Sequence, residues 1–241
     1  MVRIYASDLH IHTCLSPCAE EEMSPRNIVR TAVEAALDII AVTDHNSGKN
    51  VSAVMEASVD CPLTVIPGME VQCREEVHLL SLFESLQALE EWDAFIYEHL
   101  PDVRNDPDIF GHQPIVDKEG YVLRFEERLL INSLSLSLGE VVKGVGDRGG
   151  ICIPSHVDRE AFSIIGQLGY IPPDLSIAAV EITGDQGGKV PEGYEVVTAS
   201  DAHVLRAIGT KRTLFLLEAP TIEEIQQGLR GEGGRRVKGL S

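Results

Sequence analysis

Two histidines at the end of the first predicted strand have a spacing that suits a metal site. His10 and His12 lie two positions apart in the run Asp8-Leu9-His10-Ile11-His12-Thr13. Residues at i and i+2 of an extended strand point to the same face, so both imidazoles can reach one ion. A lone His-x-His pair is weak evidence, because single histidines are often ordinary core or surface residues. The rest of the sequence therefore decides the matter.

Similar residues recur where other predicted strands end. Apolar, mostly β-branched runs cover residues 39–43, 63–67, 77–83, 151–154 and 195–200. The polar residues in or directly after these runs are Asp44, His45, Glu70, His78, His156, Asp201 and His203. Strands that alternate with helices and carry functional residues at their ends are typical of a β/α barrel, whose active site gathers at one face. The pattern predicts one metal centre assembled from several strands.

Five motifs carry a resemblance to a known family, and they occur in a fixed order. They are DLHIHT, VTDHN, PGMEV with a downstream histidine, PSHVD and ASDAH. This ordered set resembles the PHP family, the polymerase and histidinol phosphatase superfamily, over residues 2–203. The resemblance implies an α/β fold, a distorted (β/α)7 TIM-like barrel. It also implies two or three divalent ions and the hydrolysis of phosphate esters.

The resemblance, carried over residue by residue, implies three metal sites. The first ion would be bound by His10, His12, Glu70 and Asp201. Glu70 would bridge to a second ion, which is also bound by His78 and His156. A third ion would be bound by His45 and His203. Asp44 would act from outside the ligand set by orienting a metal-bound histidine.

The loop after the first motif departs from the family pattern. Cys18 stands at the spacing where some relatives have a histidine that completes the third site. The expected ions are Mn, Zn or Fe. A thiolate ligand would favour zinc or iron over manganese. Glu20 or Glu21 could serve in its place, and a loop thiol without a role is the remaining alternative.

Three basic residues are candidates for binding a substrate phosphate. Arg159 follows His156 closely, and a guanidinium matches phosphate oxygens bidentately. A surface ion pair of Arg159 with Asp158 or Glu160 is the competing interpretation. Lys49 and Arg206 lie near other predicted ligands in the sequence and are further candidates, although a single lysine after a turn is more often just solvated.

Composition limits the class of substrate. The chain has 241 residues, 20 Lys and Arg against 38 Asp and Glu, and a net charge of −18. Such a chain lacks the general basic footprint of a protein that binds long nucleic acid. Bound divalent ions would make the pocket locally positive, which favours a small phosphorylated substrate. The length suits one barrel-sized domain, expected over residues 1–230.

Further features suggest a compartment and the ends of the domain. No apolar run approaches the roughly 20 residues of a membrane span, and the N-terminus shows no secretory signal pattern, so we expect a cytoplasmic protein without membrane contact. Five cysteines without a CxxC pair argue against a disulfide framework. The Gly-rich, basic residues 231–241 are predicted to form a flexible tail.

The segment over residues 101–133 is the least barrel-like part of the sequence. Two strand-like runs flank Asp117-Lys118-Glu119-Gly120, which predicts a β-hairpin. Insertions on barrels often shape the pocket, so we expect this one to form a lid or a contact between two copies of the chain.

The sequence thus predicts a metal-dependent phosphoesterase in which metal-bound hydroxide attacks a phosphomonoester or a nucleotide-type substrate. One alternative is an exonuclease on short oligonucleotides, and another is a non-catalytic metal-binding regulatory domain. A C–N metallohydrolase is a third alternative. Such enzymes often use a carboxylated lysine at a strand end, and no predicted strand end here carries a lysine.

Overall fold

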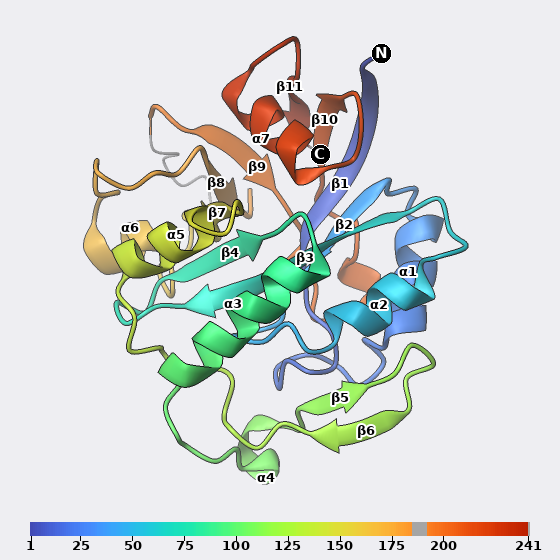
Figure 1. The fold of residues 1–241 in the computed structure, drawn as a ribbon, viewed down its shortest axis with the longest axis vertical. Coiled ribbons are helices and arrows are strands. Elements are labelled where there is room, and N and C mark those ends of the chain that lie inside the picture. Colours follow the sequence, from blue (N-terminus) through green and yellow to red (C-terminus); the bar gives the residue numbers. More distant parts are fainter. Residues whose placement is uncertain (185–191, 241) are drawn as a thin grey trace.

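A curled sheet of seven strands forms the centre of the protein (Figure 1). The computed structural model describes residues 1–184 and 192–240. In spatial order the strands are β11 (Arg236–Leu240), β10 (Thr213–Leu217), β1 (Arg3–Ile11), β2 (Ile39–Val42), β3 (Thr64–Gln72), β4 (His78–Leu82) and β7 (Ile151–Pro154). A separate parallel pair comprises β8 (Ala179–Ile182) and β9 (Glu195–Thr198). The arrangement confirms the predicted distorted TIM-like barrel.

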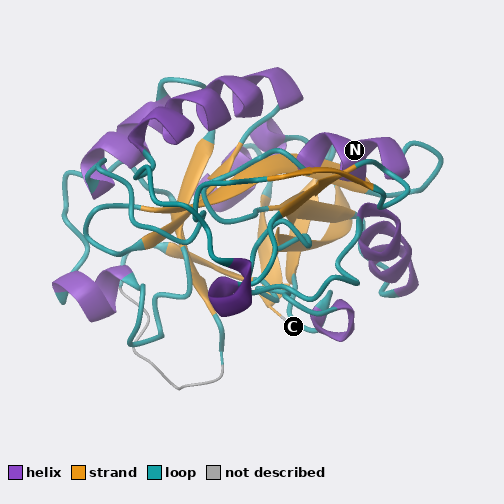
Figure 2. Ribbon diagram, turned by 90° about the horizontal axis from the view of Figure 1, so that it is seen from below, coloured by secondary structure: helices purple, strands orange, loops and turns teal. Residues whose placement is uncertain are grey.

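Helices lie around the strands (Figure 2). They are α1 (Pro25–Glu34), α2 (Val51–Ala57), α3 (Leu86–His99), α5 (Leu138–Gly146), α6 (Ile164–Leu168) and α7 (Ile222–Arg230). Neighbouring strand residues such as Ile39 and Ile40 belong to two different apolar clusters, because successive side chains point to opposite faces. Among residues 1–184 and 192–240, no helix is both long and apolar enough to cross a bilayer.

Strand directions bring the predicted ligands to one edge of the sheet. β1, β2 and β3 are parallel neighbours, so their carboxyl ends lie side by side. β4 runs antiparallel to β3 and begins at this edge, where His78 is paired with Gln72. Isolated bridges join His45 to Glu70 and Ile11 to Ala202, and they extend the edge toward the segment after β9.

The barrel differs from a regular (β/α)7 repeat because several neighbouring strands are antiparallel. β4 is antiparallel to both β3 and β7, and β10 is antiparallel to β1. Only residues 73–77 connect β3 to β4, which is far too short for a helical crossover. This connection explains why His78 enters the site from the start of its strand, whereas the other strand-borne ligands lie at strand ends.

The prediction of a flexible tail over residues 231–241 is wrong for residues 236–240. Arg236–Leu240 forms β11, which is antiparallel to β10 with Val237 opposite Phe215. Main-chain ladder bonds form whatever the side chains are, so the polar composition gave no signal for this strand. Arg235 fixes the approach to it by pairing with Glu218 and Glu224. Ser241 lies outside the described residues.

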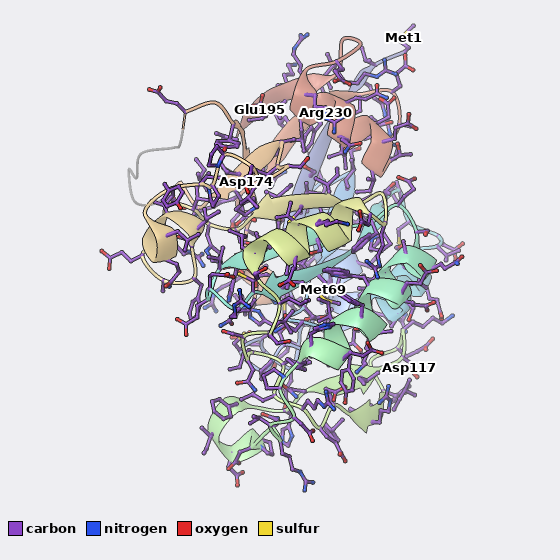
Figure 3. All side chains as sticks on the ribbon, turned by 60° about the vertical axis from the view of Figure 1, so that its left-hand side comes forward. Met1, Met69, Asp117, Asp174, Glu195 and Arg230 are labelled. Atoms are coloured by element: carbon purple, nitrogen blue, oxygen red, sulfur yellow. The ribbon has the colours of Figure 1, made fainter. Side chains whose placement is uncertain are left out.

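The predicted hairpin is confirmed within the insertion. It comprises β5 (Pro114–Val116) and β6 (Val122–Phe125), and it follows the short helix α4 (Pro107–Phe110). The hairpin lies at the opposite end of the molecule from both termini (Figure 1), and the label on Asp117 marks its turn (Figure 3). Tyr121, directly before β6, and Leu123 within it are exposed, at 73% and 66% accessible.

Buried polar side chains fix the base of the insertion to the loop after β2. The Asn50 amide donates to the carbonyl oxygen of Pro114 at 3.1 Å, and its oxygen accepts from the Val116 N–H at 3.0 Å. The Asn46 amide donates to the carbonyl oxygens of Leu130 and Asn132. The base is therefore a fixed part of the barrel, and the expectation of a lid or a dimer contact now concerns the exposed tip alone.

We predict that Asn50→Ala lowers the free energy of unfolding by about 2 kcal/mol, because it leaves two buried main-chain groups unpaired. Urea denaturation measures this change. Asn27→Ala is the matched control, since its exposed amide donates to the Glu22 carbonyl at the surface, and we expect less than about 0.5 kcal/mol there. Equal losses in the two variants would contradict the proposed anchoring role.

Candidate metal centre

Eight predicted ligands meet at one edge of the barrel. They are His10, His12, His45, Glu70, His78, His156, Asp201 and His203. The first six are buried, and Asp201 and His203 are partly exposed. Residues from β1, β3 and β4 and from the segments after β2, β7 and β9 therefore form a single cluster.

The Glu70 carboxylate lies at the centre of this cluster and is 1% exposed. Five ring nitrogens surround its two oxygens: Nε2 of His10 (3.2 Å), Nδ1 of His78 (3.1 Å), Nε2 of His156 (3.4 Å), Nδ1 of His45 (3.0 Å) and Nε2 of His12 (3.6 Å). Burial alone would raise the pKa of Glu70. The neighbouring His78 and His10 more than offset this effect and hold the pKa well below its usual value.

Asp201 faces the same cluster from the segment after β9. Its Oδ1 lies 3.3 Å from Nε2 of both His10 and His12. Its Oδ2 accepts a 2.7 Å hydrogen bond from Nη1 of Arg159. Asp201 has a φ of +50° and His156 a φ of +33°, left-handed values that are uncommon for residues with a β-carbon. Such strain persists only where the surroundings impose it, and it clusters at functional sites.

Hydrogen bonds outside the cluster set the orientation of the first two histidines. His10 Nδ1 lies 2.9 Å from Oε2 of Glu181, and His12 Nδ1 lies 2.9 Å from Oγ of Ser16. A proton on each Nδ1 leaves each Nε2 with its lone pair directed inward. The two Nε2 atoms are 3.1 Å apart. Two converging lone pairs are suited to a shared cation.

Asp44 is linked to His12 through Ser16. Ser16 Oγ donates to Oδ1 of Asp44 at 2.7 Å and is thereby oriented to accept from His12 Nδ1. Asp44 also accepts hydrogen bonds from the main-chain N–H and the hydroxyl of Thr13. The orienting contact predicted for Asp44 is thus made through one intermediate hydroxyl.

Two residues that orient ligands, Glu181 and Gln72, were not among the predicted site residues. Glu181 is fully buried in β8, where it accepts from His10 and from the main-chain N–H of His156. A charged residue inside an apolar strand needs a partner, and this was the available signal. Gln72 Oε1 lies 3.2 Å from Nε2 of His78, which directs His78 Nδ1 toward Glu70. Nothing in the sequence around Gln72 suggested this role.

A second group of imidazoles lies beside Cys18. His12 and His203 stack with ring centroids 4.1 Å apart, and His12 and His45 are 4.6 Å apart. Burial of the thiol would raise its pKa, but hydrogen bonds with His203 and His45 lower the pKa of Cys18 to about 6. The loop of Cys18 is held there because the Glu20 N–H donates to the His203 carbonyl. Cys18 therefore lies beside His45 and His203, although the group of converging ligand atoms there comprises His12, His45 and His203 alone among the described residues.

The residues present fit a group of divalent cations. Three triads have ligand atoms within 4.8 Å of one another: His10, His12 and Glu70; His45, Glu70 and His78; and His12, His45 and His203. Within the described part of the chain, the buried Nδ1 atom of His156 lacks a hydrogen-bond partner. Buried polar atoms are seldom unsatisfied, and imidazole with carboxylate is a donor set that suits zinc, iron and manganese.

The three predicted phosphate-binding residues lie in different surroundings. Arg159 reaches the rim of the cluster through Asp201, and neither of its predicted surface partners supplies this contact. Lys49 is instead paired with the buried Glu126 of the insertion, and its Nζ lies 4.3 Å from the centre of the Tyr97 ring. Arg206 is exposed on the short helix η1 (Leu205–Ala207). Only Arg159 contacts the ligand cluster.

Comparisons with known proteins agree with the fold. Endonuclease Q from Pyrococcus furiosus, a lesion-specific endonuclease, is 18% identical with a TM-score of 0.73, and the match covers 99% of this chain and 58% of that chain. The complex of endonuclease Q with a 27-mer duplex that has an abasic lesion is 17% identical, with the same TM-score, 98% of this chain covered and 58% of that chain. This chain therefore spans little more than half the length of those proteins.

A proposed metal-dependent phosphoesterase from Bifidobacterium adolescentis is 18% identical, has a TM-score of 0.52, and is matched over 82% of this chain and 87% of that chain. No curated protein matches the sequence significantly. The family model of the PHP domain matches residues 8–170, which is more than half of the chain. The matched range contains six of the eight clustered ligands and the loop that carries Arg159. The chain therefore belongs to the PHP domain family.

Proposed function

We propose that this PHP-domain protein is a metal-dependent phosphoesterase that acts on a small phosphomonoester or a nucleotide-type substrate. The observation that carries the proposal is the buried Glu70 carboxylate, which is surrounded by five imidazoles. A carboxylate with two oxygens directed at separate histidine groups is suited to bridge two ions. The cluster would hold two or three divalent ions, with Mn, Zn and Fe as candidates.

The chain's own residues would bind and orient the reactants. When bound, the ions activate water near neutral pH and offset charge on phosphoryl oxygens. Glu181, Gln72 and the Ser16–Asp44 pair keep the ligand nitrogens directed inward. Because these hydrogen bonds exist before substrate binds, the site needs little reorganisation during the reaction.

Arg159 is the residue that we assign to the substrate phosphate. One of its nitrogens donates to Asp201, and its side chain remains 40% exposed. A guanidinium has five N–H donors in a fixed fork, so donors remain for a phosphate held at the ions. Lys49, which is paired with Glu126, would instead help to fix the insertion.

Cleavage of short oligonucleotides is the alternative function. The fold shared with endonuclease Q favours it. The net charge of −18 disfavours a long duplex, because few basic side chains are available to neutralise phosphates. An assay that offers a nucleotide, a short single strand and a duplex to the same metal-loaded sample separates these activities. A purely regulatory domain would hydrolyse none of them.

We predict that Asp201→Asn lowers kcat by about 10²–10³-fold in a phosphomonoester assay with manganese, because it removes a charge at the centre. Circular dichroism checks that the fold is kept. Asp174→Asn, which changes an exposed aspartate, is the matched control and should keep full activity. Undiminished turnover in Asp201→Asn would place the reaction elsewhere.

We also predict that Glu181→Gln weakens metal binding by about 10–100-fold, because the amide accepts the His10 proton less strongly than a carboxylate does. Equilibrium dialysis with manganese or zinc measures the affinity. Glu195→Gln changes an exposed residue on the neighbouring strand β9 and should bind as the wild type does. Wild-type affinity in Glu181→Gln would show that His10 is oriented by other groups.

A further inference from the structure

Phe162, in the loop between β7 and α6, is an exposed aromatic residue at the rim of the metal centre. Its ring lies parallel to that of His78, with centroids 4.8 Å apart and an interplanar angle of 17°. Its carbonyl oxygen accepts a 2.9 Å hydrogen bond from the His78 N–H. The side chain nevertheless remains 40% accessible. One face of the ring therefore covers a predicted ligand, and a large part of the side chain is open to solvent.

The loop holds this ring in a strained conformation. Phe162 has a φ of +56°, which is unusual for a bulky residue and would suit glycine or asparagine better. The Ser163 hydroxyl donates to the Arg159 carbonyl at 2.5 Å and, as the N-cap of α6, accepts from the Gly166 N–H. Strained backbone positions of this kind cluster at functional sites.

The same loop carries Arg159. The side chains of Arg159 and Phe162 contact different parts of the metal centre. Arg159 lies on Asp201 and Phe162 lies on His78, while His10 and Glu70 lie between them. Phe162 is three positions from Arg159 on this short loop, so an apolar ring surface lies on the loop that would hold the phosphate. Aromatic faces bind planar bases by stacking, without dependence on which base is present.

We propose that Phe162 forms a subsite on which the base of a nucleotide stacks while its phosphate lies beside Arg159. The inference rests on the proposed phosphoesterase function and assigns its substrate class. The competing role, a simple apolar cover for His78, would not require an aromatic ring. A leucine in this place would still cover His78, whereas a tyrosine would still stack.

The test is calorimetric binding to manganese-loaded protein, with two ligands in which a methylene group replaces the scissile ester oxygen. One is the analogue of adenosine 5′-monophosphate, and the other is the analogue of ribose 5-phosphate, which lacks the base. We expect the wild type and Phe162→Tyr to prefer the adenosine ligand about tenfold. Phe162→Leu should lose this preference and bind the ribose ligand as before. Tyr170→Ala, an exposed aromatic outside the cluster, should match the wild type.

Equal affinity of the wild type for the two ligands would overturn the subsite. A Phe162→Leu loss that is the same for both ligands would also overturn it, because such a loss reports only the cover over His78. Absence of ester hydrolysis together with an intact base preference would overturn the proposed function and leave the subsite standing. A dinucleotide analogue with the same 5′ group shows whether the bound base belongs to a mononucleotide or to the end of an oligonucleotide. Tighter binding than that of the adenosine ligand supports an oligonucleotide end, and equal binding supports a mononucleotide.

Discussion

The buried charge of Glu70 is the constraint on which the rest of the structure depends. A carboxylate that is 1% exposed is strongly destabilising unless opposite charges or hydrogen-bond donors surround it. Five imidazoles do so here, and they come from four separate segments of the chain. Parallel β1–β3 and antiparallel β4 bring those segments to one edge. The fold and the metal centre are thus two consequences of the same arrangement.

The residues around this centre determine what it can do chemically. Each imidazole has one nitrogen for a ligand bond, and the other must be fixed by a neighbour. Glu181 does this for His10, Gln72 for His78, and the main-chain oxygen of Asp201 for His203. Left-handed backbone conformations at His156 and Asp201 complete the set, at a cost in stability that the surrounding packing offsets.

The local pattern was sufficient to predict residues whose position follows from the strand itself. His10 and His12 face the same way because of the two-residue period, and their Nε2 atoms are 3.1 Å apart. The contacts of Lys49 could not be predicted, because its partner Glu126 is 77 residues away and their pairing depends on how the insertion folds back. Glu181 was missed for a similar reason, since only the placement of β8 brings it to His10. β11 was not predicted, because main-chain pairing leaves little trace in the amino-acid composition.

Metal content per chain tests the central claim most directly. Elemental analysis would be applied to wild type and Glu70→Gln, both purified without chelators or a histidine tag and then reconstituted with manganese, zinc or iron. The account predicts two or three ions per wild-type chain and a clear loss in Glu70→Gln, because the bridging carboxylate is removed. A wild-type chain that binds no ion after reconstitution, or a Glu70→Gln chain with undiminished content, would contradict a metal centre built around Glu70.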